Sequence, residues 1–98
     1  MKKKLSPILT LFYTHNFPKK FNTNSLKRYS VTIGIGGNIG DTKRIFDKLI
    51  LCLKKDARFT LLMTSPLLKN PPFGFLEQSY FLNGIIRLKT NLCPNAFL

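Results

Sequence analysis

The chain contains 98 residues, which is enough for one small domain at most. Sixteen basic and four acidic residues give it a formal charge of +12, and such an excess is typical of proteins that bind nucleic acid or an anionic membrane surface. The charge is weaker support for a polyphosphate substrate, because an enzyme that binds ATP needs only a few well-placed cations. The hydrophobic fraction of 44% is sufficient for a core.

Residues 1–28 differ in composition from the rest of the chain, with seven basic residues and no acidic residue. Their apolar run from Pro7 to Tyr13 is too short to span a membrane, and it lacks the longer apolar core and the cleavage site of a secretory signal. An organelle-targeting presequence would match the absence of acids, but such presequences usually prefer arginine to lysine. We therefore predict a flexible or loosely docked basic extension, with irregular chain at Asn16–Lys20 and Asn22–Ser25.

The first strand is predicted at Tyr29–Ile35, where bulky residues alternate with serine, threonine and glycine and leave one face nearly bare. The glycine-rich turn Gly36–Gly40 follows, with Asp41 at the expected N-cap of a helix. The turn is not a Rossmann fingerprint, because Ile39 occupies the position of the third glycine, and it is not a P-loop, because no Gly-Lys-Ser/Thr follows. It serves either as a tight strand-to-helix connection or as a direct ligand contact.

Three further elements are expected after this turn. A helix is predicted at Thr42–Lys55, a second strand at Arg58–Leu68 that Ser65-Pro66 bends or ends, and a third strand at Tyr80–Thr90. Pro94 is expected at the first turn of a new helix. The apolar stripe of the first helix comprises Ile45, Phe46, Leu49, Ile50, Cys52 and Leu53.

A stiff loop leads from Lys69 into the third strand. Two consecutive prolines fix the backbone after Asn70, and the alternation of the strand places Phe81 and Asn83 on the same face. A flat ring beside a carboxamide, near backbone groups of fixed direction, suits a flat heterocycle with donor and acceptor edges. The alternative is that Phe81 belongs to the core and that Asn83 caps a turn.

Two separated motifs give the chain a family resemblance. Gly34-Ile-Gly-Gly-Asn-Ile-Gly-Asp41 comes first, and Asn70-Pro-Pro-Phe-Gly, Glu77-Gln78 and Phe81-Leu-Asn83 follow. In this order they resemble the first half of the 6-hydroxymethyl-7,8-dihydropterin pyrophosphokinases, from about Tyr29 to Leu98. The resemblance implies a folate-pathway transferase that moves a pyrophosphoryl group from ATP, with magnesium, to a pterin. It also implies a monomer when the domain is complete.

The resemblance assigns roles to individual residues. It implies that Phe81 stacks on the pterin ring, that Asn83 hydrogen-bonds the amide edge of the pterin, and that a backbone segment reads the remainder of the ring. The residues of that backbone segment are Asn70, Pro71 and Phe73. The loop near the substrate corresponds to Gly36, Gly37 and Asn38. The chain departs from the family pattern at Leu68 and Lys69, where an aromatic and an acidic residue are usual, and at Gly37, where serine is usual.

No metal site is predicted within this chain. The four carboxylates lack the i, i+2 spacing on a strand that would pair oxygen ligands for magnesium. Cys52 and Cys93 lack metal-ligand spacing, and the single His15 lies far from both, so we expect two reduced thiols in a cytoplasmic protein. The resemblance places the ligands of ATP and magnesium after residue 98. We therefore expect no pyrophosphoryl transfer by the chain alone.

The order strand, helix, strand, strand, start of helix predicts an α+β fold, an incomplete ferredoxin-like plait over residues 29–98 that stops at its second helix. Two other functions remain open. One is a basic module that binds nucleic acid, although the aromatic residues do not form the paired motifs of RNA-binding sheets, so contact with nucleic acid is expected only nonspecifically through charge. The other is a truncated fragment without a function of its own. Binding to a membrane is not expected.

Overall fold

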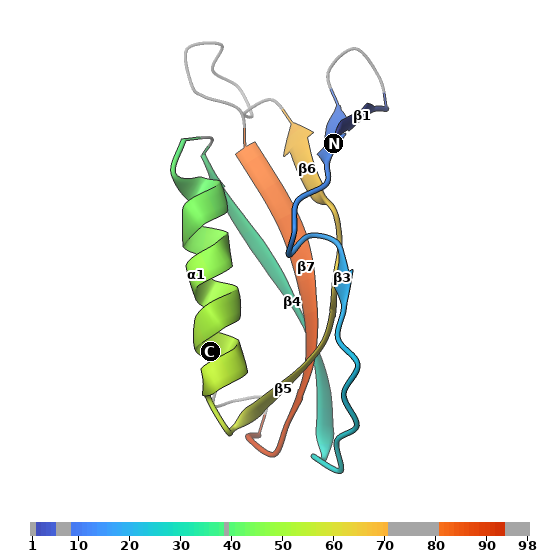
Figure 1. The fold of residues 1–98 in the computed structure, drawn as a ribbon, viewed down its shortest axis with the longest axis vertical. Coiled ribbons are helices and arrows are strands. Elements are labelled where there is room, and N and C mark those ends of the chain that lie inside the picture. Colours follow the sequence, from blue (N-terminus) through green and yellow to red (C-terminus); the bar gives the residue numbers. More distant parts are fainter. Residues whose placement is uncertain (1, 6–8, 39, 71–80, 94–98) are drawn as a thin grey trace.

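The computed structural model describes residues 2–5, 9–38, 40–70 and 81–93. These residues form an α+β fold with one helix and a curled antiparallel sheet of seven strands (Figure 1). In chain order the elements are β1 (Lys2–Lys4), β2 (Thr10–Phe12), β3 (Lys19–Lys20), β4 (Tyr29–Asn38), α1 (Thr42–Lys55), β5 (Phe59–Thr64), β6 (Leu67–Asn70) and β7 (Phe81–Thr90). The helix that was predicted to begin near Pro94 lies outside the described residues.

Strand β7 is the centre of the sheet. It pairs along its whole length with β4, from Tyr29 opposite Thr90 to Asn38 opposite Phe81, and on its other side it pairs with both β5 and β6. Strands β5 and β6 act as one bent strand, because Ser65 at the bend stays bonded to β7. Its backbone N–H donates to the Ile85 carbonyl oxygen at 2.9 Å, and its Oγ accepts from the Ile85 N–H at 2.8 Å. The predicted bend at Ser65-Pro66 is therefore confirmed.

Helix α1 covers one face of the sheet (Figure 1). Phe46 and Ile50 are buried in one core cluster with Leu82, Ile86 and Leu88 of β7. The core as a whole consists of Phe17, Phe46, Ile50, Leu61, Leu67, Leu82, Ile86 and Leu88. Each such side chain contributes about 1.5–3 kcal/mol when fully buried. The core thus lies between α1 and one face of the sheet, and the opposite face of β7 is left for other roles.

The predicted helix bounds are confirmed, but the predicted apolar stripe is wrong at two positions. Ile45 is 59% exposed, and Cys52 is exposed as well. Both side chains lie about 100° or more around the helix from Phe46, given about 3.6 residues per turn, so a single sheet face cannot cover them. Asp41 holds the N-cap position without a side-chain capping bond, whereas the Thr42 hydroxyl donates to the carbonyl oxygen of Asn38.

The N-terminal segment differs from its prediction as a flexible or loosely docked extension. Strand β1 pairs with β2, β2 pairs with β6, and β3 pairs with β5. Phe17 has no exposed surface and its ring centroid lies 6.0 Å from that of Phe46. No sequence pattern predicts this docking, because a single aromatic side chain and two short pairings along a sheet edge produce no apolar periodicity. Asn22–Ser25, by contrast, lies outside helices and strands, as predicted.

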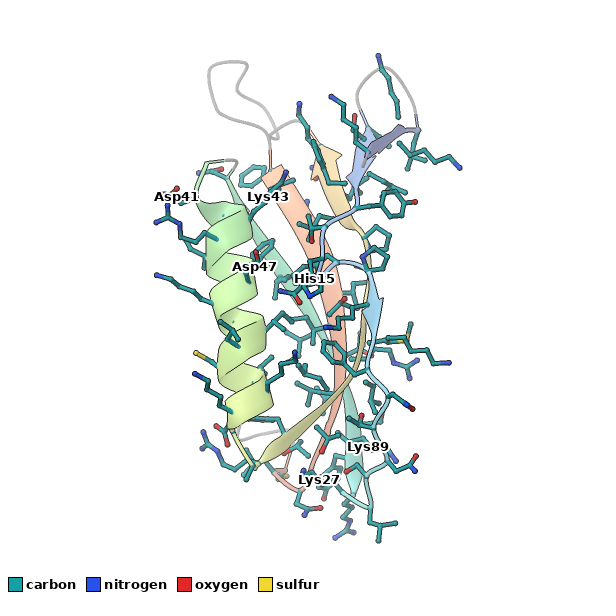
Figure 2. All side chains as sticks on the ribbon, viewed as in Figure 1. His15, Lys27, Asp41, Lys43, Asp47 and Lys89 are labelled. Carbon is teal, nitrogen blue, oxygen red and sulfur yellow. The ribbon has the colours of Figure 1, made fainter. Side chains whose placement is uncertain are left out.

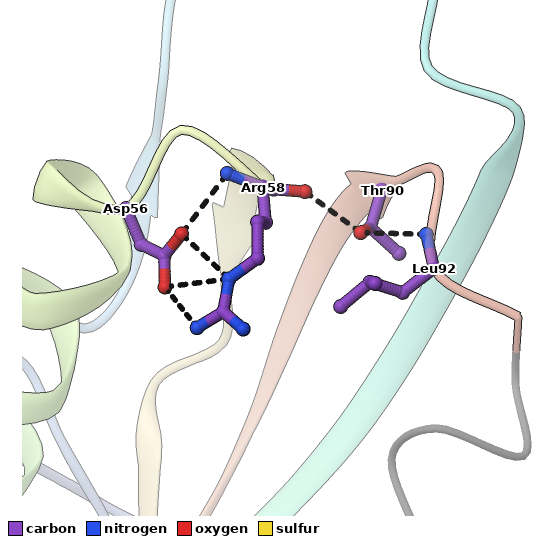
Figure 3. Close-up of polar contacts among 4 residues, drawn as sticks. All are labelled: Asp56, Arg58, Thr90 and Leu92. Carbon is purple, nitrogen blue, oxygen red and sulfur yellow. Dashed lines mark hydrogen bonds and ion pairs between the residues drawn. The ribbon is translucent and has the colours of Figure 1, made fainter.

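Polar contacts tie the end of β7 to the turn after α1 (Figure 3). The guanidinium of Arg58 donates to Asp56, with Nη2 and Oδ2 2.6 Å apart, and these hydrogen bonds lower the pKa of the Asp56 carboxyl to about 2. The same contact raises the pKa of Arg58. Thr90 Oγ1 donates to the Arg58 carbonyl oxygen at 2.7 Å and accepts from the Leu92 N–H at 3.2 Å. In the described part of the chain, no helix combines the length and the apolar character needed to cross a membrane.

Candidate functional site

Five of the residues singled out in the sequence meet at one end of the sheet, the upper end in Figure 1. Directly opposite residues of antiparallel strands share a face, and the register places two rows of them side by side. The outer row is Asn38, Phe81 and Asn70, and the inner row is Gly36, Asn83 and Leu68. Their neighbour Leu82 is buried and faces the core. The two rows therefore lie on the face of the sheet that points away from α1.

The carboxamide of Asn83 is held between two strands. Its Nδ2 donates to Oδ1 of Asn70 on β6. On the other side, its Oδ1 lies 2.7 Å from the position that a Cβ on Gly36 would occupy, so the amide rests on the bare backbone of β4. A carboxamide has two donor hydrogens and an acceptor oxygen, and one bond to Asn70 leaves capacity for a ligand. Only glycine at position 36 permits this close approach.

Phe81 lies one row further toward the end of the sheet. It is half-buried, and Asn38 and Asn70 stand opposite it on the two neighbouring strands. The ring therefore belongs to the same face as the Asn83 carboxamide. This confirms the geometric part of the prediction, namely that Phe81 and Asn83 share a face, and it removes Phe81 from the buried core.

Gly37 does not join these residues. It stands opposite the buried Leu82, on the core face of β4, and a Cβ there would lie 3.1 Å from Cγ2 and 3.2 Å from Oγ1 of Thr42. Gly37 thus permits the first residue of α1 to pack against the strand. Gly37 lies within β4, which extends to Asn38, and not in a loop, while its predicted position near the substrate stays a prediction. Pro71 and Phe73, whose backbone was expected to complete the site, lie outside the described residues.

Two contributions were missed by sequence reasoning. Thr42 is buried, and its hydroxyl anchors the carbonyl oxygen of Asn38, which fixes the start of α1 to the end of β4. The second is Phe12, which pairs with Leu67 of β6 and lies below the Lys43 ammonium group, 4.4 Å from the ring centroid. The sequence signal for the first contact was Thr42 itself, because a threonine hydroxyl can donate to the carbonyl oxygen four residues earlier. No signal pointed to Phe12, because its segment has no periodic pattern.

The described residues do not fit a magnesium–ATP complex. No three side chains of His, Cys, Asp or Glu come together among them. Asp47 accepts a hydrogen bond from Asn16 Nδ2 at 3.0 Å, and Asp56 is paired with Arg58. Magnesium bound to a triphosphate requires oxygen ligands in an octahedral arrangement, and the described carboxylates form no such cluster. What this arrangement can do is present an aromatic ring and an amide edge to a flat ligand.

The family follows from a match over two thirds of the chain. The family model described as 7,8-dihydro-6-hydroxymethylpterin-pyrophosphokinase (HPPK) matches residues 32–98, which include every residue of the two rows. The chain belongs to the HPPK family. The predicted resemblance is therefore confirmed. Residues 1–31, with β1, β2 and β3, lie outside the match to the HPPK model.

Curated relatives agree with this assignment. A Campylobacter jejuni protein named 2-amino-4-hydroxy-6-hydroxymethyldihydropteridine pyrophosphokinase is 44% identical over 77 residues, which are 79% of this chain and 48% of the relative. A Helicobacter pylori protein of the same name is 33% identical over 83% of this chain and 50% of its own length. The folic acid synthesis protein fol1 of Schizosaccharomyces pombe is 30% identical over 76% of this chain and 11% of its own length.

The chain spans about half the length of the bacterial HPPK proteins that it matches. No solved structure matches the chain with significance.

Proposed function

We propose that this chain forms the pterin half-site of an HPPK enzyme, which transfers a pyrophosphoryl group from ATP to 6-hydroxymethyl-7,8-dihydropterin in folate biosynthesis. The observation that carries the proposal is the carboxamide of Asn83, held between Asn70 and the bare backbone of Gly36 and lying on the same face as Phe81. The names of the bacterial relatives and of the fission-yeast protein support the pathway.

The chemistry of a pterin matches these groups. A pterin is flat, and one edge of its pyrimidine ring presents neighbouring donors and an acceptor. Phe81 offers a ring on which it can stack, an interaction of about 1–3 kcal/mol if stacking on nucleobases is a fair guide. Asn83 offers the complementary donor and acceptor of its amide. The backbone of Asn70, with that of Pro71 and Phe73, would read the rest of the ring.

ATP and magnesium enter this proposal through the family alone. When bound, ATP supplies the pyrophosphoryl group, and magnesium neutralises the charge that develops on the phosphate oxygens. The described residues lack the carboxylate pair that such a metal site requires, so we derive no step through these groups. We propose that their ligands lie outside this chain and that the chain alone does not transfer the group.

We further propose that β4, α1, the bent pair β5 and β6, and β7 are the first part of a ferredoxin-like plait. The placement of β7 between β4 and the bent pair supports this arrangement, as does the position of α1 on one face. Two free, exposed cysteines, Cys52 and Cys93, support a cytoplasmic location. We expect the complete domain to be monomeric, which a sedimentation experiment on a longer protein would check.

The direct test is a titration with 6-hydroxymethylpterin, followed by its fluorescence. Replacing Asn83 by alanine removes the amide and leaves the pterin edge unpaired, a loss of about 1–3 kcal/mol, so the affinity should fall about fivefold to 150-fold. Asn24→Ala is the control, because Asn24 is exposed and lies in the irregular segment away from the site. Equal affinities for the wild type and Asn83→Ala would remove the assignment.

Nucleic acid is a second candidate partner, and we propose that it binds only through charge. The face of β7 that carries Asn83 continues with Arg87 and Lys89. Lys20 of β3 lies opposite Met63 of β5, which in turn lies opposite Arg87. Binding of this kind should weaken steeply with salt and show no sequence preference. A clear preference for one RNA sequence at physiological salt would favour a nucleic-acid module over the pterin half-site.

A further inference from the structure

Residues 9–21, here called the edge segment, run antiparallel along the outer edge of β6 and then of β5. Strand β2 pairs with β6, from Thr10 opposite Lys69 to Phe12 opposite Leu67, and β3 pairs with β5 through Lys19 opposite Thr64. The Phe21 N–H donates to the Leu62 carbonyl oxygen at 3.0 Å. The edge segment therefore occupies backbone groups that a sheet edge would otherwise leave open.

Between its two strands the edge segment crosses from the sheet to α1. A tight turn from Thr14 to Phe17 is closed by two bonds, from Thr14 N–H to the Phe17 carbonyl oxygen at 2.7 Å and from Phe17 N–H to Thr14 Oγ1 at 3.1 Å. This turn puts the Phe17 ring into the core and lets Asn16 donate to Asp47 of α1 at 3.0 Å. Figure 2 shows Asp47 and Lys43 on the side of α1 that faces this segment. The edge segment thus joins the sheet edge to the helix.

Phe12 is the residue of the edge segment that links β6 to the start of α1. It stands opposite Leu67, the first residue of β6, and the last residue of that strand is Asn70, the partner of Asn83. Its ring also lies 4.4 Å from Lys43 Nζ, in the first turn of α1. The residue before Lys43 is Thr42, which anchors the end of β4 through Asn38. One side chain therefore contacts β6, which carries Asn70, and α1, whose first residue anchors the end of β4.

We propose that Phe12 is a positioning residue of the pterin half-site. Through β6 it fixes Asn70, and through Lys43 it fixes the start of α1 and with it the end of β4, so that the Asn83 amide is held in one orientation before the ligand arrives. The inference rests on the proposed function. It goes beyond the family assignment, because Phe12 lies outside the residues that match the HPPK model. A preorganised group binds more tightly because less conformational entropy is lost on binding.

The chain offers matched pairs for the test. Lys43→Gln removes the cation from Phe12 and leaves the core intact, and Lys54→Gln removes an equivalent cation that lies 5.5 Å from the Phe21 ring, near the far end of α1. Phe12→Leu is paired with Phe59→Leu, because both rings pack against the core, lie next to a cation and stand in paired strands. Phe59 is opposite Thr90, at the end of the sheet away from the site.

Each full-length variant is titrated with 6-hydroxymethylpterin, its thermal unfolding is measured, and amide exchange is followed at Lys69 and Asn70. Lys43→Gln and Phe12→Leu should weaken binding about two- to tenfold and speed exchange at both amides, whereas Lys54→Gln and Phe59→Leu should not. Phe12→Tyr keeps the aromatic ring and should therefore bind the pterin as tightly as the wild type. Since the pterin is uncharged, the loss of a cation does not weaken its binding by itself.

The outcomes separate the two proposals. If Asn83→Ala weakens binding but Lys43→Gln and Phe12→Leu do not, the positioning role is refuted and the half-site stands. If Asn83→Ala has no effect, the half-site is refuted. The exchange rates at Lys69 and Asn70 then decide the positioning role alone, because they need no ligand. An equal loss of affinity in Phe12→Leu and Phe59→Leu would show a general loss of stability and would also overturn the inference. If Phe12→Leu does not fold, the comparison of Lys43→Gln with Lys54→Gln decides the positioning role.

Discussion

Replacing Gly36 by alanine should displace the Asn83 amide while leaving the core intact. The new Cβ would lie 2.7 Å from Asn83 Oδ1, and an ordinary contact begins at 3.4 Å, so the two atoms must separate by about 0.7 Å. Gly36 is held by its pairing with β7, so the side chain of Asn83 is the part that moves. Because Oδ1 and Nδ2 belong to one rigid amide, the bond from Nδ2 to Asn70 is weakened at the same time.

We expect pterin affinity to fall about fivefold to 150-fold, as for Asn83→Ala, because both changes remove the same amide from the site. Unfolding stability should fall by only about 0.5–1.5 kcal/mol, the usual net contribution of one hydrogen bond. Pterin fluorescence gives the affinity, and urea unfolding gives the stability. A normal affinity for Gly36→Ala would refute the idea that the bare backbone at this position holds Asn83.

The same strand supplies the control. Gly34 lies two residues earlier on the same face of β4, and a Cβ at that position would meet nothing within 4 Å. Gly34→Ala should therefore leave pterin affinity unchanged, and it should stabilise the fold by up to about 1 kcal/mol by restricting the unfolded chain. In the Asn83→Ala background, Gly36→Ala should have no further effect on affinity, because the atom that it displaces is absent.

Three further outcomes are expected. Phe17→Ala should lower the free energy of unfolding by about 3–5 kcal/mol, since the ring is fully buried, and unchanged urea unfolding would show that the N-terminal segment does not dock. The pKa of Asp56 is lowered from its usual 3.8 to about 2 in the folded protein, so its contribution is present above pH 4 and is lost between about pH 4 and 2; thermal unfolding of Asp56→Asn should lack this step. The wild-type chain with ATP, magnesium and hydroxymethyldihydropterin should release no AMP above background, and metal-dependent release that disappears with Asn83→Ala would contradict this.

The long elements were predictable because each carries its own repeating pattern. Alternating residues marked β4 and β7, and a 3.6-residue period marked α1, so the face shared by Phe81 and Asn83 followed from local spacing alone. The contact between Asn83 and Asn70 depends on how β6 and β4 are aligned with β7. Nothing within a single strand encodes that register, and the close approach at Gly36 was therefore visible only in the structure.

The N-terminal segment could not be predicted for a different reason. Its stability comes from one buried ring, Phe17, and from single hydrogen bonds to residues far along the chain, such as that from Asn16 to Asp47. Contacts of this kind leave no period in the sequence, and the high proportion of lysine suggests exposed chain instead. Ile45 and Cys52 were misassigned although they belong to a clear pattern. The apolar stripe on α1 is broader than the sheet face beneath it, so these two side chains remain exposed.

The two faces of β7 separate binding from stability. Leu82, Ile86 and Leu88 face α1 and are buried, whereas Phe81 and Asn83 alternate with them on the opposite face. Changes on the first face should therefore act mainly on unfolding, and changes on the second mainly on pterin affinity. Contacts between the sheet and α1 that also hold the site in place are the exceptions. The ring of Phe12 in the sheet, beneath Lys43 of α1, is such a contact. Variants of Phe12 and Lys43 should therefore change pterin affinity although neither residue touches the ligand. Such variants test whether the whole fold holds the site in place, which variants of the ligand contacts cannot do.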